Sequence, residues 1–152
     1  MAISLINAAS QGGVPAFSAY QNSAQSFSSG TFTKATINTK IFDTASAYDN
    51  TTNYRFTPLV AGYYQVSGSL AFGGSATGWG VAAIYKNGSI YAQGVACPHN
   101  TNTGAFSTTT DLVYLNGSTD YIELWGVSAG ATISTQGNQQ GCYFSAVLVR
   151  SA

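Results

Sequence analysis

The stretch from Phe56 to Leu70 joins a turn to a strand whose phase is fixed by the sequence. Phe56 ends one predicted strand, Pro58 lies in a bend, and Gly62 offers the φ freedom that we expect the chain to need when it enters the next strand. From there every second residue falls on the same face. Tyr64, Val66, Gly68, Leu70 and Phe72 share one face, which we predict to be core or interface. The opposite face begins with Tyr63, so both faces of this strand carry a phenol ring.

The rest of the chain is organised in the same way, as short alternating or apolar runs between clusters of Gly, Asn, Ser and Thr. No sustained helical periodicity interrupts them. Asn87-Gly88 predicts a two-residue hairpin, and Asn116-Gly117 predicts a second one. We predict strands at 15–20, 31–42, 53–57, 62–72, 79–86, 89–96, 105–114, 119–126, 131–135 and 142–149. The expected fold class is all-β, an antiparallel two-sheet jelly-roll sandwich of about ten strands.

The size and charge of the chain limit its organisation and its partners. Its 152 residues correspond to one domain, which we place at 15–152 after an N-terminal arm at 1–14. Only 7% of the residues are charged, five basic against five acidic. Such an uncharged surface suits a protein that is partly covered by neighbours in an assembly. The basic residues are scattered, which argues against nucleic acid, and no apolar run is long enough for membrane insertion.

The arm carries an apolar group at its tip, and Ile3, Leu5 and Ile6 are candidate docking residues. The same segment lacks the basic region of a signal peptide. We therefore expect the protein to stay in the cytoplasm where it is made, or to leave by lysis.

No group of residues predicts catalysis or a cofactor. His99 is the only histidine, and its loop-like surroundings predict an ordinary exposed side chain, since zinc needs three or four ligands. Asp43 and Asp49 are the pair to consider for calcium, against the alternative that both are turn-forming residues. We expect no enzymatic activity, no cofactor and no bound metal.

Cysteine and aromatic residues leave two further questions open. Two cysteines, Cys97 and Cys142, cannot define a disulfide framework, and both are expected to be small buried residues. Aromatic side chains on the predicted strands could form a sugar-binding face, although strand-borne aromatics more often belong to a core or a subunit interface. The candidates for such a face are Trp79, Tyr85, Tyr91 and Trp125.

Several motifs together resemble the globular-head domain of the complement recognition subcomponent, a branch of the tumour necrosis factor superfamily. The spacing Phe56-x5-Gly62-x-Tyr64-x-Val66 is similar to the signature of that family. Further similar segments occur in the family's order, from residue 15 to the C-terminus. They are Pro15-Ala-Phe-Ser-Ala-Tyr20, Phe42-Asp43 with Tyr48-Asp49, Ile84-Tyr-Lys-Asn-Gly-Ser89, Leu115 to Leu124, and Phe144-Ser-Ala-Val-Leu-Val149. Its signature and core positions would be Phe42, Phe56, Gly62, Tyr64, Val66, Phe144 and Leu148.

The resemblance implies a homotrimer in which one sheet of each jelly roll faces the others. Strands that are apolar on both faces agree with this, because an intramolecular core and a subunit contact each need an apolar surface. The candidate trimer-interface residues are Tyr63, Tyr143, Val147 and Val149.

The resemblance and the composition together favour a structural protein of a bacteriophage virion. We expect a trimeric capsid decoration, or cement, protein that is anchored through its arm and has the major capsid protein or another virion protein as its partner. The alternative is the receptor-binding tip of a tail fibre that recognises host surface glycans. A secreted lectin-like recognition module is a third hypothesis, which the missing export signal disfavours.

Overall fold

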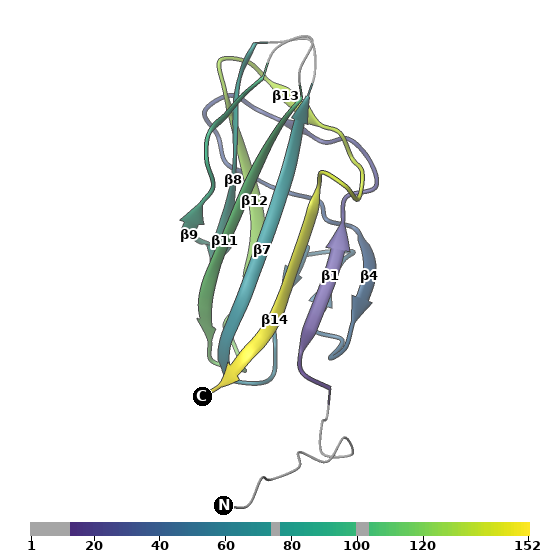
Figure 1. Cartoon of the computed structure of the whole chain (residues 1–152), viewed down its shortest axis with the longest axis vertical. Helices are drawn as coiled ribbons and strands as arrows, with labels where there is room; N and C mark the ends of the chain where they lie inside the picture. The colour runs from purple at the N-terminus through teal and green to yellow at the C-terminus, as the bar shows by residue number, and fades with distance from the viewer. Residues whose placement is uncertain (1–12, 74–76, 100–103) are drawn as a thin grey trace, which may run out of the picture.

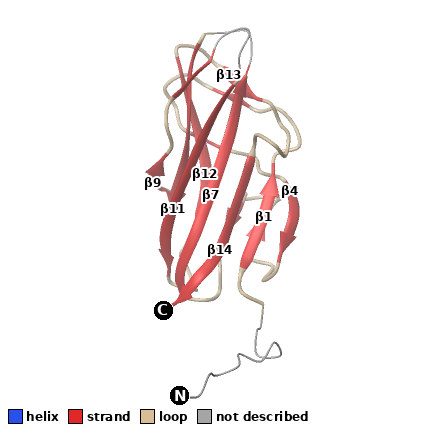
Figure 2. Cartoon of the chain, viewed as in Figure 1, coloured by secondary structure: helices blue, strands red, loops and turns tan. Residues whose placement is uncertain are grey.

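The chain forms two antiparallel sheets packed face to face, in a computed structural model that describes residues 13–73, 77–99 and 104–152 (Figure 1). The predicted all-β, two-sheet jelly roll is confirmed, and within the described residues Figure 2 shows strands and loops only. No described segment is a helix long and apolar enough to cross a membrane. The described residues contain fourteen strands instead of about ten. The short strands Ser26–Phe27, Tyr48–Asp49 and Cys97–His99 were missed because an alternating pattern needs at least four residues, and the predicted strand 31–42 is two strands, Thr33–Lys34 and Thr39–Asp43.

Sheet A has the long strand β7 at its centre. β7 pairs with β11 along nearly all its length, and its other side pairs with β14 and, near its end, with β13. Beyond β14 lie β1 and the edge strand β4, and β2 pairs with β13. The strands are β1 (Ala16–Tyr20), β2 (Ser26–Phe27), β4 (Thr39–Asp43), β7 (Gly62–Gly73), β11 (Ala105–Leu115), β13 (Ile133–Thr135) and β14 (Tyr143–Ser151).

Sheet B is built on the pair β8 and β12. Its strands are β3 (Thr33–Lys34), β5 (Tyr48–Asp49), β6 (Arg55–Phe56), β8 (Gly78–Lys86), β9 (Ser89–Gln93), β10 (Cys97–His99) and β12 (Ile122–Ala129). The predicted hairpin joins β8 to β9, where Asn87 and Gly88 have φ values of 51° and 80°. Asn116-Gly117 was predicted wrongly as a second hairpin. It begins a longer turn that carries the chain from β11 in sheet A to β12 in sheet B.

A cluster of aromatic rings holds the two sheets together. The ring of Phe17 on β1 stacks on Tyr48 of sheet B at 4.4 Å and on Phe56 of sheet B at 4.6 Å between centroids. Phe144 on β14 meets Phe17 edge to face at 5.2 Å, and Tyr64 on β7 meets Phe56 at 5.6 Å. These rings are fully or almost fully buried. Since they bridge two sheets and come from five strands, the cluster fixes which face of each strand points inward.

Most of the expected core positions are buried, with one clear exception. Phe56, Tyr64, Val66 and Phe144 are inaccessible to solvent, and Leu148 is partly buried against the core. Phe42 is instead 48% exposed, so its placement in the core was wrong. It lies on the edge strand β4, where a register shift against β1 pairs Phe42 with the outward-facing Ser18.

Gly62 is required for a reason other than the one expected. It begins β7 in extended backbone and has no positive φ. A Cβ at this position would overlap the carbonyl oxygen of Arg150 and lie 2.6 Å from Cδ1 of Leu148. Glycine is therefore needed because β14 passes directly over this residue.

Replacing Gly62 with alanine should destabilise the domain by about 1–3 kcal/mol, because the backbone of β14 must move to admit the methyl group. Gly73→Ala is the matched control at the other end of β7, where the nearest atom to an added Cβ is 3.6 Å away. We expect this control to change stability by no more than about 0.5 kcal/mol. Urea unfolding of both variants measures the difference, and equal effects would contradict the close-approach explanation.

Candidate interaction surfaces

The outward face of sheet A is an extended surface without charged side chains on its two longest strands. Residues of β7 and β11 alternate, and the outward positions of this alternation carry side chains that are polar and uncharged, aliphatic or aromatic. Asp111 on β11 is also exposed, but it falls between two of these positions. The outward residues of β14 before its bulge, Tyr143 to Val147, follow the same rule. We define the sheet A face as Tyr63, Gln65, Ser67, Phe106, Thr108, Thr110, Leu112, Tyr114, Ser145 and Val147.

Polar groups on the sheet A face largely bind one another. Gln65 donates from Nε2 to Oγ1 of Thr110 at 2.8 Å, and that hydroxyl lies 3.2 Å from Ser67 Oγ and donates to the backbone carbonyl of Val66. The rings of Tyr63 and Tyr114 are in contact, with centroids 5.4 Å apart. Covering this face with another protein would therefore leave few polar groups without partners, which lowers the cost of removing it from water.

A depression of about 360 Å³ lies on the same side of sheet A. Ala16 and Ser18 of β1 line one part of the depression, and Val147 of β14 lines another part. The exposed ring of Phe42 on β4 lies at its border. The face is consequently not flat, and its hollow is on the β4 side while Phe106, Leu112 and Tyr114 project from β11 on the opposite side.

Of the four candidate trimer-interface residues, three are exposed. Tyr63 and Val147 lie on the sheet A face, and Val149 occupies the bulge of β14. Tyr143, which is half-buried, points outward from the same strand opposite Ser69. Sequence reasoning did not single out Phe106, Leu112 and Tyr114, although the alternation within the predicted strand 105–114 places all three on one face.

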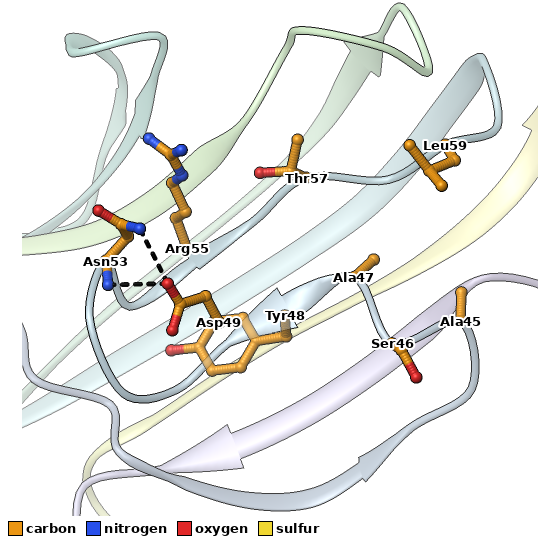
Figure 3. A pocket seen from close by; sticks show the side chains of 9 residues that line it. All are labelled: Ala45, Ser46, Ala47, Tyr48, Asp49, Asn53, Arg55, Thr57 and Leu59. Atoms are coloured by element: carbon orange, nitrogen blue, oxygen red, sulfur yellow. Dashed lines mark hydrogen bonds between the residues drawn. The ribbon is translucent and has the colours of Figure 1, made fainter.

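We call the end of the molecule where the described chain begins and ends the base (Figure 1). A second hollow lies there, since its lining residue Ala45 follows Thr44, which bonds to Val14, and its lining residue Leu59 is two residues from Ala61, which bonds to Ala152. This base pocket has a volume of about 400 Å³ and is formed by β5, β6 and their adjoining turns (Figure 3). It is lined by Ala45, Ser46, Ala47, Tyr48, Asp49, Asn53, Arg55, Thr57 and Leu59. Leu59, which is 78% exposed, stands at one end of the pocket, far from the Asp49–Asn53 contact in Figure 3.

The charged groups that line the base pocket already have partners. Asp49 Oδ1 accepts bonds from the backbone of Thr51 and Thr52 and from the Thr51 hydroxyl, while Oδ2 accepts two bonds from Asn53. The backbone N–H groups of Thr52 and Thr51, followed by those of Asn53, hold the pKa of this carboxyl well below its usual range. The Arg55 guanidinium lies over the ring of Tyr121, 4.6 Å from its centroid.

The two carboxylates proposed for calcium close turns in this structure. Asp43 accepts from the backbone N–H groups of Ala47 at 3.1 Å and Tyr48 at 3.0 Å, and Lys40 lies 3.6 Å away. Asp49 closes the following turn. No cluster of three potential metal-ligating side chains occurs in the described ranges. The hydrogen bonds of Asp43 and Asp49 to nearby backbone N–H groups are those of turn-forming residues.

His99 and the cysteines differ in part from the expectation. His99 is only 2% exposed on β10, so its placement in an exposed loop was wrong, and neither ring nitrogen has a hydrogen-bond partner in the part of the chain that the structure describes. Cys142 is buried as expected, whereas Cys97 is half-buried and donates from Sγ to the carbonyl of Phe106 at 2.7 Å. Both thiols are free.

The aromatic residues considered for a sugar-binding face do not form one group. Tyr85 and Trp125 stack on each other at 4.5 Å on the outward side of sheet B, which covers part of each ring. The indole of Trp125 donates to the buried carboxylate of Glu123, which pairs with Lys34 at 2.6 Å. Trp79 and Tyr91 are exposed elsewhere.

Comparison with known proteins shows the fold and no closer relationship. The chain matches no protein-family model and no curated protein. Among solved structures, the Eiger TNF of S. frugiperda has a TM-score of 0.65 at 9% identity, over 91% of this chain and 94% of that one. Murine APRIL has a TM-score of 0.61 at 12% identity, over 90% and 100%. The vertex protein P5 of PRD1 has a TM-score of 0.60 at 17% identity, over 91% and 99%.

The chain thus has a TNF-like jelly-roll fold. This confirms the fold that the resemblance implies, while membership of the superfamily and the more specific likeness to the complement globular head stay predictions. At these identities the similarity says nothing about partners or activity.

The Asp49 hydrogen bonds predict how stability depends on pH. The pKa of Asp49 is lower in the folded chain than in the unfolded chain, where it is about 4. The ionised carboxylate therefore stabilises the fold at pH values above about 4. This stabilisation is lost as the pH falls toward the pKa of the folded state. Asp49→Asn should be less stable than wild type at pH 6, since an amide nitrogen cannot accept. The difference in unfolding free energy should shrink between pH 5 and pH 2. A difference that stays constant over this range would contradict the assignment.

Proposed function

We propose that this protein is a non-enzymatic structural protein of a phage virion, a trimeric decoration protein that binds the capsid through its N-terminal end. It would be made in the host cytoplasm and end in the virion. The observation that carries the proposal is the uncharged sheet A face, on a fold that this chain shares with a vertex protein.

The sheet A face supports self-association because of its composition and its hydrogen bonding. Protein interfaces are depleted of charged residues at their centre and enriched in aromatic ones. Here Tyr63, Phe106 and Tyr114 are exposed together with Leu112 and Val147. An exposed apolar surface of this extent on a stable monomer would promote aggregation, so burial against other copies is the simplest use for it.

The unequal halves of the face support a ring of copies in head-to-tail contact. The hollow lies near β1 and β4, and the projecting aromatic and aliphatic side chains lie on β11. Such complementary but different halves pair head to tail, and a head-to-tail contact closes into a ring when the rotation permits. The homotrimer implied by the sequence resemblance is one such ring.

The base supports attachment to a larger particle. The described chain begins at the base, so the arm leaves the domain there, and in a closed trimer three arms leave at the same end (Figure 1). Leu59, Val60 and Val14 are exposed aliphatic residues of this region, with Val149 on the last strand. Apolar side chains grouped in this way are suited to protein contact.

The alternative, a fibre tip that binds host glycans, would use the opposite end. There the described loops carry amide side chains, among them Gln139 and Gln140, and the exposed Trp79 lies at the start of β8 on that side. Amides and an aromatic ring suit a neutral saccharide. The buried His99 lies on β10, which pairs with β8 beside this tryptophan. No charged side chain belongs to these loops in the described residues, and we therefore prefer the decoration protein.

Val147→Lys should convert the trimer to monomers, because it places a charge in the hollow of the face that we propose to be buried. The matched control is Ile90→Lys, since Ile90 is 44% exposed against 40% for Val147 but faces outward from sheet B. Light scattering should give three times the 15.8 kDa chain mass for wild type and control. A wild type that is monomeric at micromolar concentration would refute the trimer.

Deleting residues 1–12 should remove the protein from virions while the soluble trimer persists. The measurement is co-sedimentation of the protein with purified particles, together with the host adsorption of those particles. Loss from the particle with adsorption unchanged is the expected result. Retention on intact particles that no longer adsorb would favour the fibre tip instead.

A further inference from the structure

The base pocket remains accessible when the sheet A face is covered. It is formed by strands of sheet B and by the turns next to them, and none of its lining residues belongs to the sheet A face. A second binding function is therefore available at the base of each copy, separate from the contact that would hold the trimer together.

We propose that the base pocket of one copy binds the apolar segment Ile3 to Ile6 from the N-terminal arm of a neighbouring copy. The inference rests on the trimer of the proposed function and specifies how its arms are used. Each of the three arms would cross to the next subunit and bind in its base pocket. The side of the trimer that faces the capsid would then consist of three bases joined by exchanged arms, not of three free arms.

The chemistry of the pocket fits an uncharged apolar occupant. Both carboxylate oxygens of Asp49 accept hydrogen bonds, from five donors in all, so Asp49 does not need a cation. The Arg55 guanidinium lies over the ring of Tyr121. The remaining lining contributes the aliphatic groups of Ala45, Ala47 and the projecting Leu59, beside the ring of Tyr48 and the small hydroxyl side chains of Ser46 and Thr57. Residues 1–13 contain no charged side chain. In an extended segment Ile3 and Leu5 point the same way, which gives two aliphatic groups for one apolar wall.

The point where the arm leaves the domain favours a neighbour's pocket. Thr44 Oγ1 donates to the carbonyl of Val14 at 2.8 Å, which ties the start of the arm beside Ala45 on the rim of its own pocket. Eight residue steps separate Ile6 from Val14, enough to span about 26 Å when extended. The interval Asn7-Ala-Ala-Ser-Gln-Gly-Gly13 has no large apolar group. A spacer of this length is long enough to bring the apolar segment to the pocket of the next copy around the ring.

Cross-linking between differently tagged chains tests the proposal. In a Cys97→Ser background, a tagged full-length chain with Ile3→Cys is co-expressed with an untagged chain with Leu59→Cys, and mild oxidation should link the two. Ile3→Cys paired with Ile90→Cys is the control and should link far less. No cross-link, or a link that forms only within a chain carrying both substitutions, would overturn the proposal.

Thermal unfolding of the full-length trimer gives an independent readout. Leu59→Ser and the paired change Ile3→Ser with Leu5→Ser should each lower the unfolding midpoint, by about 2–4 °C for each kcal/mol lost, and combining them should add little. Additive effects, or no effect of Leu59→Ser, would overturn the proposal. Light scattering on the same samples separates the two levels. A trimer without cross-links removes only the arm assignment, whereas a monomer removes the proposed function as well.

Discussion

The aromatic cluster around Phe17 is the contact on which the rest of the structure depends. Its rings come from both sheets, and Phe17 alone touches Tyr48, Phe56 and Phe144. A strand has only two faces, so fixing Phe17, Tyr64 and Phe144 inward determines what β1, β7 and β14 present outward. A shift of one residue in any of these strands would exchange core and surface side chains.

This constraint links the core to the proposed assembly. With one face of β7 committed to the cluster, Tyr63 and Gln65 must face outward, and β11 presents Leu112 and Tyr114 beside them. The outward face then satisfies most of its polar groups internally and carries no charge on these two strands. A domain so poor in charge gains little from exposing this face to water, which is why we assign it to contact with other copies.

Long-range alternation made much of the fold predictable, whereas local features at edges and close approaches did not. The phase of β7 and the Asn87-Gly88 hairpin follow from the sequence alone. Phe42 was misplaced because a register shift at an edge strand turns it outward, and the role of Gly62 depends on where β14 passes. His99 is buried on β10, and this strand of three residues is too short to show an alternation of apolar and polar residues.

The candidate surfaces were predictable only in part for the same reason. Alternation along the predicted strands places Tyr63 and Val147 on an outward face. The same alternation within the predicted strand 105–114 also places Leu112 and Tyr114 outward. The base pocket joins two turns and the strands between them, and no periodic pattern predicts how turns pack.

The central claim is that three copies meet through their sheet A faces on a virion shell. Electron cryo-microscopy of purified native particles tests it most directly. The account predicts three-lobed density on the shell, with the sheet A faces turned toward a threefold axis and the bases toward the capsid. Absence of the protein from the shell, or density for a single domain with its sheet A face open to solvent, would contradict it.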